Sequence, residues 1–457
     1  MNFTDTIVAP ATPEGTSALA IVRLSGPEAI KIASKVFKGK NLEHVPTHTV
    51  HYGFIVEPGS HEIIDEVMVT IFRAPKSYTS EDIVEITCHG SVYIVRKITE
   101  KLIEAGARLA NPGEFSLRAF MNGRINLAQA EAVADLISSQ NEWQHKTAIY
   151  QMRSGWSKEL LELRKELIDY TALIELELDF AEEDVEFAKR ERLLSFINNL
   201  IHHLSRLTES FVEGNAIKEG FGVAIIGKPN AGKSTLLNAL LNEERAIVSE
   251  VPGTTRDFIE DTLQYKGLLF RLTDTAGIRA TADLIEGIGV EKALEKASKA
   301  RIVLYLFDIN ESTPFSLLHD IEVLNIDDTL IIPVANKIDQ ASWKKTAPFA
   351  QIPNIQYVSA KNRFRIEELK EFIYQICMSK FCHAFEGATI TNLRHFEALT
   401  KATKALRDAK EHLENKLSGE IVAFHLREAL DCIGQVTGQV HTEELLSSIF
   451  SRFCIGK

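Results

Sequence analysis

The sequence has little of what marks several specialised classes of protein. Its 457 residues include five cysteines and no C-x-x-C pair, so we expect reduced thiols and neither a disulfide framework nor a zinc site. It shows no apolar run of transmembrane length and no signal peptide, which predicts a cytoplasmic protein without a membrane association. Basic residues are not in excess, because the net charge is −12. This excludes a general nucleic-acid coat, although a local basic patch or a partner can still bring RNA.

What is present is ordinary for a globular protein. Hydrophobic residues make up 45% of the chain and charged residues 25%. This length and composition predict two to four domains, each with its own core.

The stretch Gly227–Ser234 reads G-K-P-N-A-G-K-S, the pattern of a phosphate-binding loop. An apolar strand is predicted directly before it at Phe221–Ile226, and a helix directly after it at Thr235–Leu241. Backbone N–H groups of such a loop and the helix N-terminus together form an anion site. Lys233 would reach the β- and γ-phosphates, and Ser234 would hold Mg²⁺. The motif alone can arise by chance, so the other nucleotide-binding motifs decide whether this loop is a nucleotide site.

Three companion motifs follow in order, each after a predicted strand. They are D-T-A-G at 274–277, N-K-I-D at 336–339 and S-A-K at 359–361. Asp274 can hold Mg²⁺ through water, and the N–H of Gly277 can reach the γ-phosphate. A carboxylate at Asp339 can accept both the N1 and N2 hydrogens of guanine, which adenine lacks. The set is typical of P-loop GTPases of the translation-factor class, and it predicts GTP as the nucleotide.

The switch regions depart from the common GTPase pattern. Ile278 stands where many GTPases carry the glutamine that orients the attacking water. Glu286 is a candidate for that role, and a solvated glutamate at a helix start is an equally good interpretation. Thr254 and Thr255 lie where a switch threonine is expected. Arg256 and Asp257, next to them, either have a catalytic role or form a salt bridge within the loop.

The residue pattern divides the chain into four segments. Residues 1–120 read as mixed α/β, residues 121–216 and 380–457 as amphipathic helices, and residues 217–379 as the GTPase domain. We predict an α/β domain, a helical bundle and a Ras-like GTPase domain inserted into that bundle.

Five stretches together resemble one family, the MnmE (also called TrmE) tRNA modification GTPases, over essentially the whole chain. They are D-T-I-V-A at 5–9, R-A-F-M-N-G-R at 118–124, L-A-Q-A-E-A at 127–132, G-T-T-R-D at 253–257 and F-C-I-G-K at 453–457.

The resemblance implies an N-terminal domain of tetrahydrofolate-binding type that also forms a homodimer. It implies a flavoprotein partner, MnmG (GidA), in a heterotetramer or larger complex that brings FAD and NADH. Together the two proteins would add an aminomethyl or carboxymethylaminomethyl group to C5 of the wobble uridine of certain tRNAs. The one-carbon unit would come from 5,10-methylene-tetrahydrofolate, for which 5-formyl-tetrahydrofolate is an analogue.

The resemblance also assigns residues in the N-terminal domain and the chain's end. The implied folate site consists of Arg23, Glu81, Arg124 and Lys457. The family often carries Lys at the place of Arg124, which keeps the charge but changes the contact geometry. Cys454 is a possible functional thiol by the same resemblance, or a small apolar residue near the folate.

In the GTPase domain, the resemblance implies K⁺ in place of an arginine finger. The implied K⁺ ligands are Asn230, Ser249, Val251 and Thr254, and Thr255 would join Ser234 on Mg²⁺. The family favours Thr at the place of Ser249, but a backbone contact survives that change. Two GTPase domains would close face to face, and Glu286 would orient the water.

The full set of predicted nucleotide-site residues comes from the motifs themselves and from the family resemblance. The catalytic residues would be Lys233, Asp274 and Glu286. The GTP-binding residues would be Asn230, Ala231, Gly232, Lys233, Ser234, Thr235, Ser249, Thr254, Thr255, Asp274, Thr275, Ala276, Gly277, Asn336, Lys337, Asp339, Ser359, Ala360 and Lys361.

Two other functions fit parts of the sequence. A GTP-switched binding protein for ribosome assembly shares the phosphate-loop and G-T-T-R-D patterns, but it would need an RNA-binding module, often basic, beside the GTPase. A helical scaffold with a decayed nucleotide site is disfavoured, because Lys233, Ser234, Asp274 and Asp339 are intact.

Overall fold

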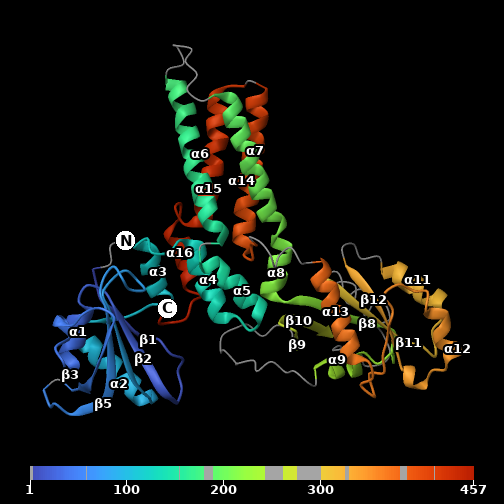
Figure 1. Cartoon of the computed structure of the whole chain (residues 1–457), viewed down its shortest axis with the longest axis horizontal. Helices are drawn as coiled ribbons and strands as arrows, with labels where there is room; N and C mark the ends of the chain where they lie inside the picture. Colours follow the sequence, from blue (N-terminus) through green and yellow to red (C-terminus); the bar gives the residue numbers. More distant parts are fainter. Residues whose placement is uncertain are drawn as a thin grey trace, which may run out of the picture. The chain divides into compact units, whose positions relative to one another are not determined.

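The computed structural model describes residues 4–57, 59–153, 155–179, 189–241, 261–274, 300–324, 329–380, 389–415 and 417–457. The chain forms two compact units (Figure 1). The first unit comprises residues 1–138, 148–197 and 404–457, and the second comprises residues 139–147 and 198–403.

A seven-stranded sheet forms the N-terminal part of the first unit, in the order β3-β4-β5-β6-β2-β1-β7. Its strands are β1 (Ile7–Pro10), β2 (Ser17–Ser25), β3 (Phe37–Gly39), β4 (Thr49–Val56), β5 (Ile63–Phe72), β6 (Ile83–Gly90) and β7 (Arg108–Leu109). Only the β1–β7 pair is parallel among these. Helices α1 (Ala29–Val36) and α2 (Val92–Glu104) pack on the sheet, because Ile32 and Leu102 share one buried core with strand residues such as Val69. A short 3₁₀ turn, η1 (Leu42–His44), follows β3.

Helices make up the rest of the first unit. They are α3 (Glu114–Met121), α4 (Leu127–Ser138), part of α5 (Glu142–Met152), α6 (Gly155–Asp179), the start of α7 (Arg190–Glu209), the end of α14 (Leu393–Glu414), α15 (Gly419–Thr437) and α16 (Glu443–Phe450). Helices α6 and α15, far apart in sequence, lie side by side (Figure 1), and Arg164 donates to the Leu430 carbonyl across them at 3.3 Å. Helical segments from both sides of the inserted domain therefore pack together, as the sequence predicts.

The second unit contains a six-stranded sheet in the order β13-β12-β11-β8-β10-β9. The strands are β8 (Phe221–Gly227), β9 (Asp261–Tyr265), β10 (Leu268–Asp274), β11 (Ile302–Asp308), β12 (Leu330–Asn336) and β13 (Gln356–Tyr357), of which only β9 pairs antiparallel. Because the other strands run parallel, their carboxyl ends meet at one edge of the sheet, and ligands of open parallel sheets bind at that edge.

Helices cover both faces of this sheet, so each face has its own core. One core joins the sheet to α9 (Lys233–Leu241) and α13 (Ile366–Lys380), and the other joins it to α11 (Pro314–Leu324) and Phe349. The continuous apolar strands β8 and β11 follow from burial on both sides. The remaining short elements are α8 (Phe211–Glu219), η3 (Ile338–Gln340), α12 (Trp343–Thr346) and η4 (Ala347–Phe349).

The observed architecture confirms the predicted fold class. The division between the two units falls inside α5, α7 and α14, so the predicted segment boundaries near residues 120, 216 and 379 stay predictions. Within the described part of the chain, no helix combines the length and apolar character needed to cross a membrane.

Candidate functional site

The phosphate loop leaves β8 through a backbone conformation that requires glycine. Gly227 has φ +151°, and a Cβ built on it would lie 2.0 Å from the Leu306 carbonyl oxygen of β11. Asn230 and Gly232 also have positive φ, at +61° and +97°. Lys233, the first residue of α9, curls back over the loop and donates to the carbonyls of Gly227 at 2.9 Å and Lys228 at 3.0 Å. The loop is therefore a backbone cradle with an ammonium group held beside it.

Asn336 connects the phosphate loop to the S-A-K segment. It is the last residue of β12 and is only 3% exposed. Its side-chain amide donates to the Ala231 carbonyl at 2.7 Å and accepts from the Ala360 N–H at 3.0 Å. A Cβ on Gly232 would lie 2.5 Å from the Asn336 Nδ2 atom, so this close approach also requires glycine. Three motifs predicted separately thus meet around one buried amide.

Lys337, next to Asn336, is fixed by a residue that the sequence reasoning missed. Its backbone is left-handed, with φ +62°, and its ammonium pairs with Asp308 at 2.8 Å. Burial acts to raise the pKa of Asp308, but hydrogen bonds from Lys337 and Asn310 outweigh it and hold the pKa below its usual range. The sequence does contain a signal that could have identified Asp308. It directly follows the apolar run Ile302–Phe307, just as Asp274 ends its own strand.

Other predicted residues lie on the same sheet edge. Asp274 pairs in register with Ile225 of β8 at the carboxyl end of β10. Asp339 is exposed on η3, and Ser234 and Thr235 are exposed on the first turn of α9. Eight predicted residues lie outside the described residues and stay predictions: Ser249, Val251, Thr254, Thr255, Thr275, Ala276, Gly277 and Glu286.

This edge has the chemistry of a nucleotide site. The cradle of backbone N–H groups and Lys233 suits phosphates. The Asp339 carboxylate, two residues beyond the fixed Lys337, suits a base that carries a pair of hydrogen-bond donors.

A second cluster forms around Tyr78 in the first unit. Three cationic groups lie over its ring: the Arg23 guanidinium at 5.7 Å, the Arg124 guanidinium at 5.5 Å and the Lys457 ammonium at 5.3 Å from the centroid. The Tyr78 hydroxyl hydrogen-bonds Ser116 at 2.8 Å. Burial raises the pKa of Tyr78, and the Ser116 contact and the nearby arginines oppose it. Tyr78 was not among the predicted residues, and no local pattern marks it.

The chain's last residues complete this cluster. Arg23 pairs with Glu85 at 2.7 Å and donates to the Gly456 carbonyl at 3.0 Å. A Cβ on Gly456 would lie 2.3 Å from the Pro10 carbonyl oxygen, so the segment lies tightly against β1. Burial lowers the pKa of Lys457, and the charge of Arg23 adds to that effect.

Glu81 is connected to the same cluster through its neighbours. Its carboxylate accepts from Ser25 Oγ at 2.6 Å and from the buried Arg118 at 3.3 Å. Its carbonyl accepts from Ser77 Oγ at 2.5 Å, and the Ser77 carbonyl accepts from Arg124. Cys454 is exposed. The structure therefore brings Arg23, Arg124 and Lys457 together at one ring, with Glu81 linked to them through Ser77.

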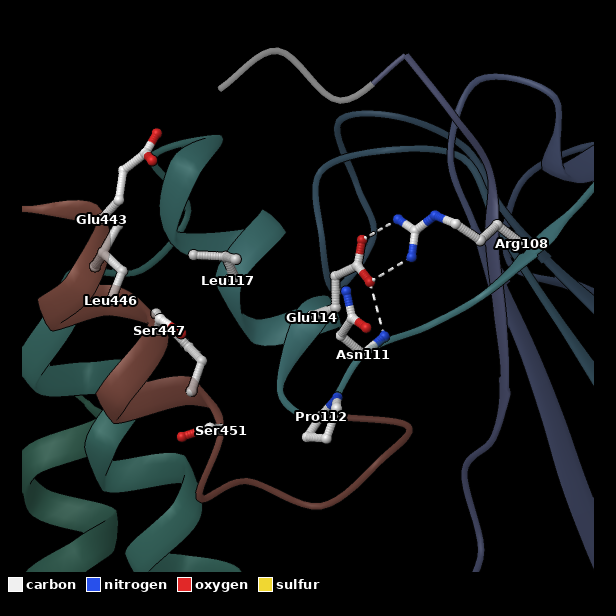
Figure 2. Close-up of a pocket in the computed structure, with 10 residues that line it drawn as sticks. Arg108, Asn111, Pro112, Glu114, Leu117, Glu443, Leu446, Ser447 and Ser451 are labelled. Atoms are coloured by element: carbon white, nitrogen blue, oxygen red, sulfur yellow. Dashed lines mark hydrogen bonds and ion pairs between the residues drawn. The ribbon is translucent and has the colours of Figure 1, made fainter.

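A cavity of about 370 Å³ in the same unit is distinct from this cluster. Figure 2 shows Arg108, Asn111 and Glu114 on one side of it and residues of α16, such as Ser447, on the other. Arg108 pairs with Glu114 at 2.6 Å and with Asp5 at 2.8 Å, and the Asn111 N–H donates to Glu114 at 2.8 Å. The Tyr78 ring and the three cations over it do not line this cavity. Arg108 and Glu114 thus satisfy each other, so we assign this pair to fixing α3 against β7.

Two family models match the chain. The family model described as the GTP-binding protein TrmE N-terminus matches residues 6–124, and the MnmE helical domain model matches residues 127–454. Among solved structures, the G domain of the FeoB iron transporter of T. maritima is 29% identical over 34% of this chain and 97% of that chain, with a TM-score of 0.26.

Curated relatives match over the whole chain. The tRNA modification GTPase MnmE of Cytophaga hutchinsonii is 49% identical, covering 100% of this chain and 98% of its own length. That of Flavobacterium johnsoniae is 48% identical over 99% of each chain, and that of Parabacteroides distasonis is 44% identical over 99% of this chain and 100% of its own. With this identity and coverage, the chain belongs to the MnmE family of tRNA modification GTPases.

Proposed function

We propose that this chain is a K⁺-activated GTPase that acts on tRNA in the cytoplasm as a homodimer, together with an MnmG (GidA) flavoprotein. The two proteins would add an aminomethyl or carboxymethylaminomethyl group to C5 of the wobble uridine, with methylene-tetrahydrofolate as the one-carbon donor. The observation that carries the proposal is the cluster of Arg23, Arg124 and Lys457 over the Tyr78 ring.

This cluster fits a folate in chemistry. A folate carries a flat pterin with adjacent hydrogen-bond donors, a benzoyl ring and a glutamate tail with carboxylates. The Tyr78 ring offers a stacking surface, and the cations over it suit carboxylates. The Glu81 carboxylate, held by Ser25 and Arg118, offers acceptors for the pterin donors. When bound, the folate would supply the one-carbon unit, and this chain's residues would orient it.

We propose that GTP is hydrolysed at the phosphate loop. Asn230 is exposed in a left-handed conformation within the loop, and its amide oxygen is a suitable ligand for a hard cation such as K⁺. The other proposed K⁺ ligands are Ser249, Val251 and Thr254, with Ser234 and Thr255 on Mg²⁺. Positive charge beside the phosphates would stabilise the transition state, as an arginine finger does. Glu286 would orient the water after two GTPase domains close.

We expect GTP turnover to be strongly stimulated in KCl relative to NaCl at equal ionic strength, and to rise per molecule with protein concentration. The reason is that K⁺ would complete the site at Asn230 and favour closure of two GTPase domains. The measurement is steady-state phosphate release by the full chain over a range of protein concentrations. Asn230→Ala should lose the difference between the two salts, whereas Asn354→Ala, at another exposed asparagine with a left-handed backbone in the same unit, should keep it. Equal slow rates of the wild-type protein in both salts would remove the K⁺ argument.

We expect Lys457→Ala to weaken binding of 5-formyl-tetrahydrofolate by roughly tenfold or more, because one charge-assisted contact is lost. Isothermal titration of the full chain measures this, with binding of a fluorescent guanine nucleotide as the check on folding. Lys38→Ala, which removes an exposed lysine on β3 of the same unit, is the matched control. Unchanged folate affinity in Lys457→Ala would contradict the assignment of this cluster.

A further inference from the structure

The side chain of Lys228, the second residue of the phosphate loop, has no role in the functions described above. A cation in such a loop is a candidate for a second phosphate ligand beside Lys233. The Lys228 ammonium instead pairs with Asp320 of α11 at 2.8 Å. The phosphate loop is thereby connected to a helix that carries none of the predicted nucleotide-binding motifs.

The helical spacing of α11 explains why Asp320 is not fully exposed. Leu317 is buried in the core between α11 and the sheet, and Ile321 and Leu324 pack against the same core. Asp320 follows Leu317 by three residues, so the two side chains lie on the same side of the helix. The Asp320 side chain is accordingly only 26% exposed. A carboxylate that is this far removed from water needs hydrogen-bonding or charged partners.

Tyr305 of β11 is the second partner of Asp320. Its hydroxyl donates to Asp320 Oδ2 at 2.9 Å, and the same oxygen pairs with Lys228. Tyr305 is buried and stands in register with Ile226, two residues before Lys228 on the neighbouring strand. Burial raises the pKa of Tyr305, and the hydrogen bond to Asp320 adds to that effect, so the hydroxyl stays protonated and keeps donating. The sheet therefore fixes the carboxylate that holds Lys228.

The backbone of Lys228 belongs to the phosphate cradle itself. Its carbonyl accepts from the Lys233 ammonium at 3.0 Å and from the Ala231 N–H at 3.3 Å. Lys228 thus contacts α11 through its side chain and the rest of the loop through its carbonyl. A loop that is already held in one conformation loses less conformational entropy when a ligand binds, which raises the affinity.

We propose that Asp320 is a positioning residue for GTP, which acts through Lys228 to hold the phosphate loop in the conformation that receives the phosphates. The inference rests on GTP binding at this loop and adds a residue outside the nucleotide-binding motifs. The chain from the end of β11 to α11 also carries Asp308, which holds Lys337 of the N-K-I-D motif at 2.8 Å. Two lysines of the nucleotide motifs are thus paired with carboxylates of one connecting segment.

The second unit contains a matched ion pair away from the phosphate loop. Lys266 pairs with Glu371 at 2.7 Å, and the Tyr265 hydroxyl donates to the same carboxylate oxygen at 3.0 Å. The two side chains of this pair are 51% and 32% exposed, close to the 56% and 26% of Lys228 and Asp320. Lys266 precedes the amino end of β10, whereas the phosphate loop follows the carboxyl end of the parallel strand β8. This pair therefore serves as the control.

The test is the affinity of the full chain for GTP and inosine triphosphate, measured by isothermal titration. Lys228→Met combined with Asp320→Asn keeps the net charge and should weaken GTP binding about fivefold, because the loop loses its connection to α11. The ratio of the two affinities should stay unchanged, since the base contacts remain. Lys266→Met combined with Glu371→Gln should bind GTP like the wild type, and so should Lys228→Arg, which keeps the ion pair.

Asp320→Asn alone distinguishes this role from one in which Lys228 is itself a phosphate ligand that Asp320 restrains. We expect Asp320→Asn to weaken GTP binding, and tighter binding would overturn the inference in favour of a phosphate ligand. Wild-type affinity in the double variant at Lys228 and Asp320, or an equal loss in the control double variant, would also overturn it. Because these affinities do not depend on K⁺ stimulation or folate binding, the inference and the proposed function can fail separately.

Discussion

Asp339→Asn is expected to change the base preference of this GTPase from guanine to xanthine. The Asp339 carboxylate is proposed to accept the N1 and N2 hydrogens of guanine together. An asparagine keeps one acceptor and adds a donor, which opposes the guanine amino group and matches the C2 carbonyl of xanthine. Loss of a paired, charge-assisted contact should weaken GTP binding by about 10³-fold.

The position of Asp339 makes this substitution informative. Asp339 is exposed on η3, so the change should leave the fold intact, unlike a change at the buried Asn336. The measurement is the Kd of the full chain for guanosine and xanthosine triphosphates. Glu322→Gln, at an exposed residue of α11, is the matched control and should keep the wild-type preference. A variant that still prefers GTP would refute the assignment of Asp339 to the base.

Much of the nucleotide site follows from the sequence because its information is local. The strand, loop and helix from Phe221 to Leu241 show a clear change from continuous apolar residues to a glycine-rich turn and then to helical spacing. The companion motifs each end a buried strand, and parallel strands place their carboxyl ends at one edge. Local pattern and topology together were enough to place Asp274 and Asn336.

The remaining features depend on contacts between distant segments. The bridge from Asn336 to Ala231 and Ala360 is set by tertiary packing, and so is the gathering of Arg23, Arg124 and Lys457 at Tyr78. Such contacts between distant segments produce no periodic pattern in the sequence. Short elements such as β1 and α3 were not predicted, because four and eight residues give too little periodicity to separate helix from strand.

Gly227→Ala is expected to destabilise the second unit by more than about 4 kcal/mol, beyond the range of most single substitutions. The added Cβ would lie 2.0 Å from the Leu306 carbonyl oxygen. That oxygen belongs to the backbone of β11, which pairs with β8 on one side and β12 on the other, so it cannot move without disturbing both ladders. The left-handed φ of +151° adds a separate penalty of about 1–3 kcal/mol.

Gly267→Ala in the same unit separates these two causes. Gly267 also has a positive φ, +79°, but the nearest atom to an added Cβ is a side-chain carbon of Glu142 at 3.3 Å. We therefore expect the backbone penalty alone, about 1 kcal/mol. Thermal unfolding with and without GDP identifies the transition of the nucleotide-binding unit, because a ligand raises the melting temperature of the unit that binds it. Because Gly227 closes the phosphate cradle, its variant should also lose the GDP-dependent shift, whereas Gly267→Ala should keep it. Equal melting temperatures for the two variants would show that β8 and β11 approach less closely at Gly227 than the structure describes.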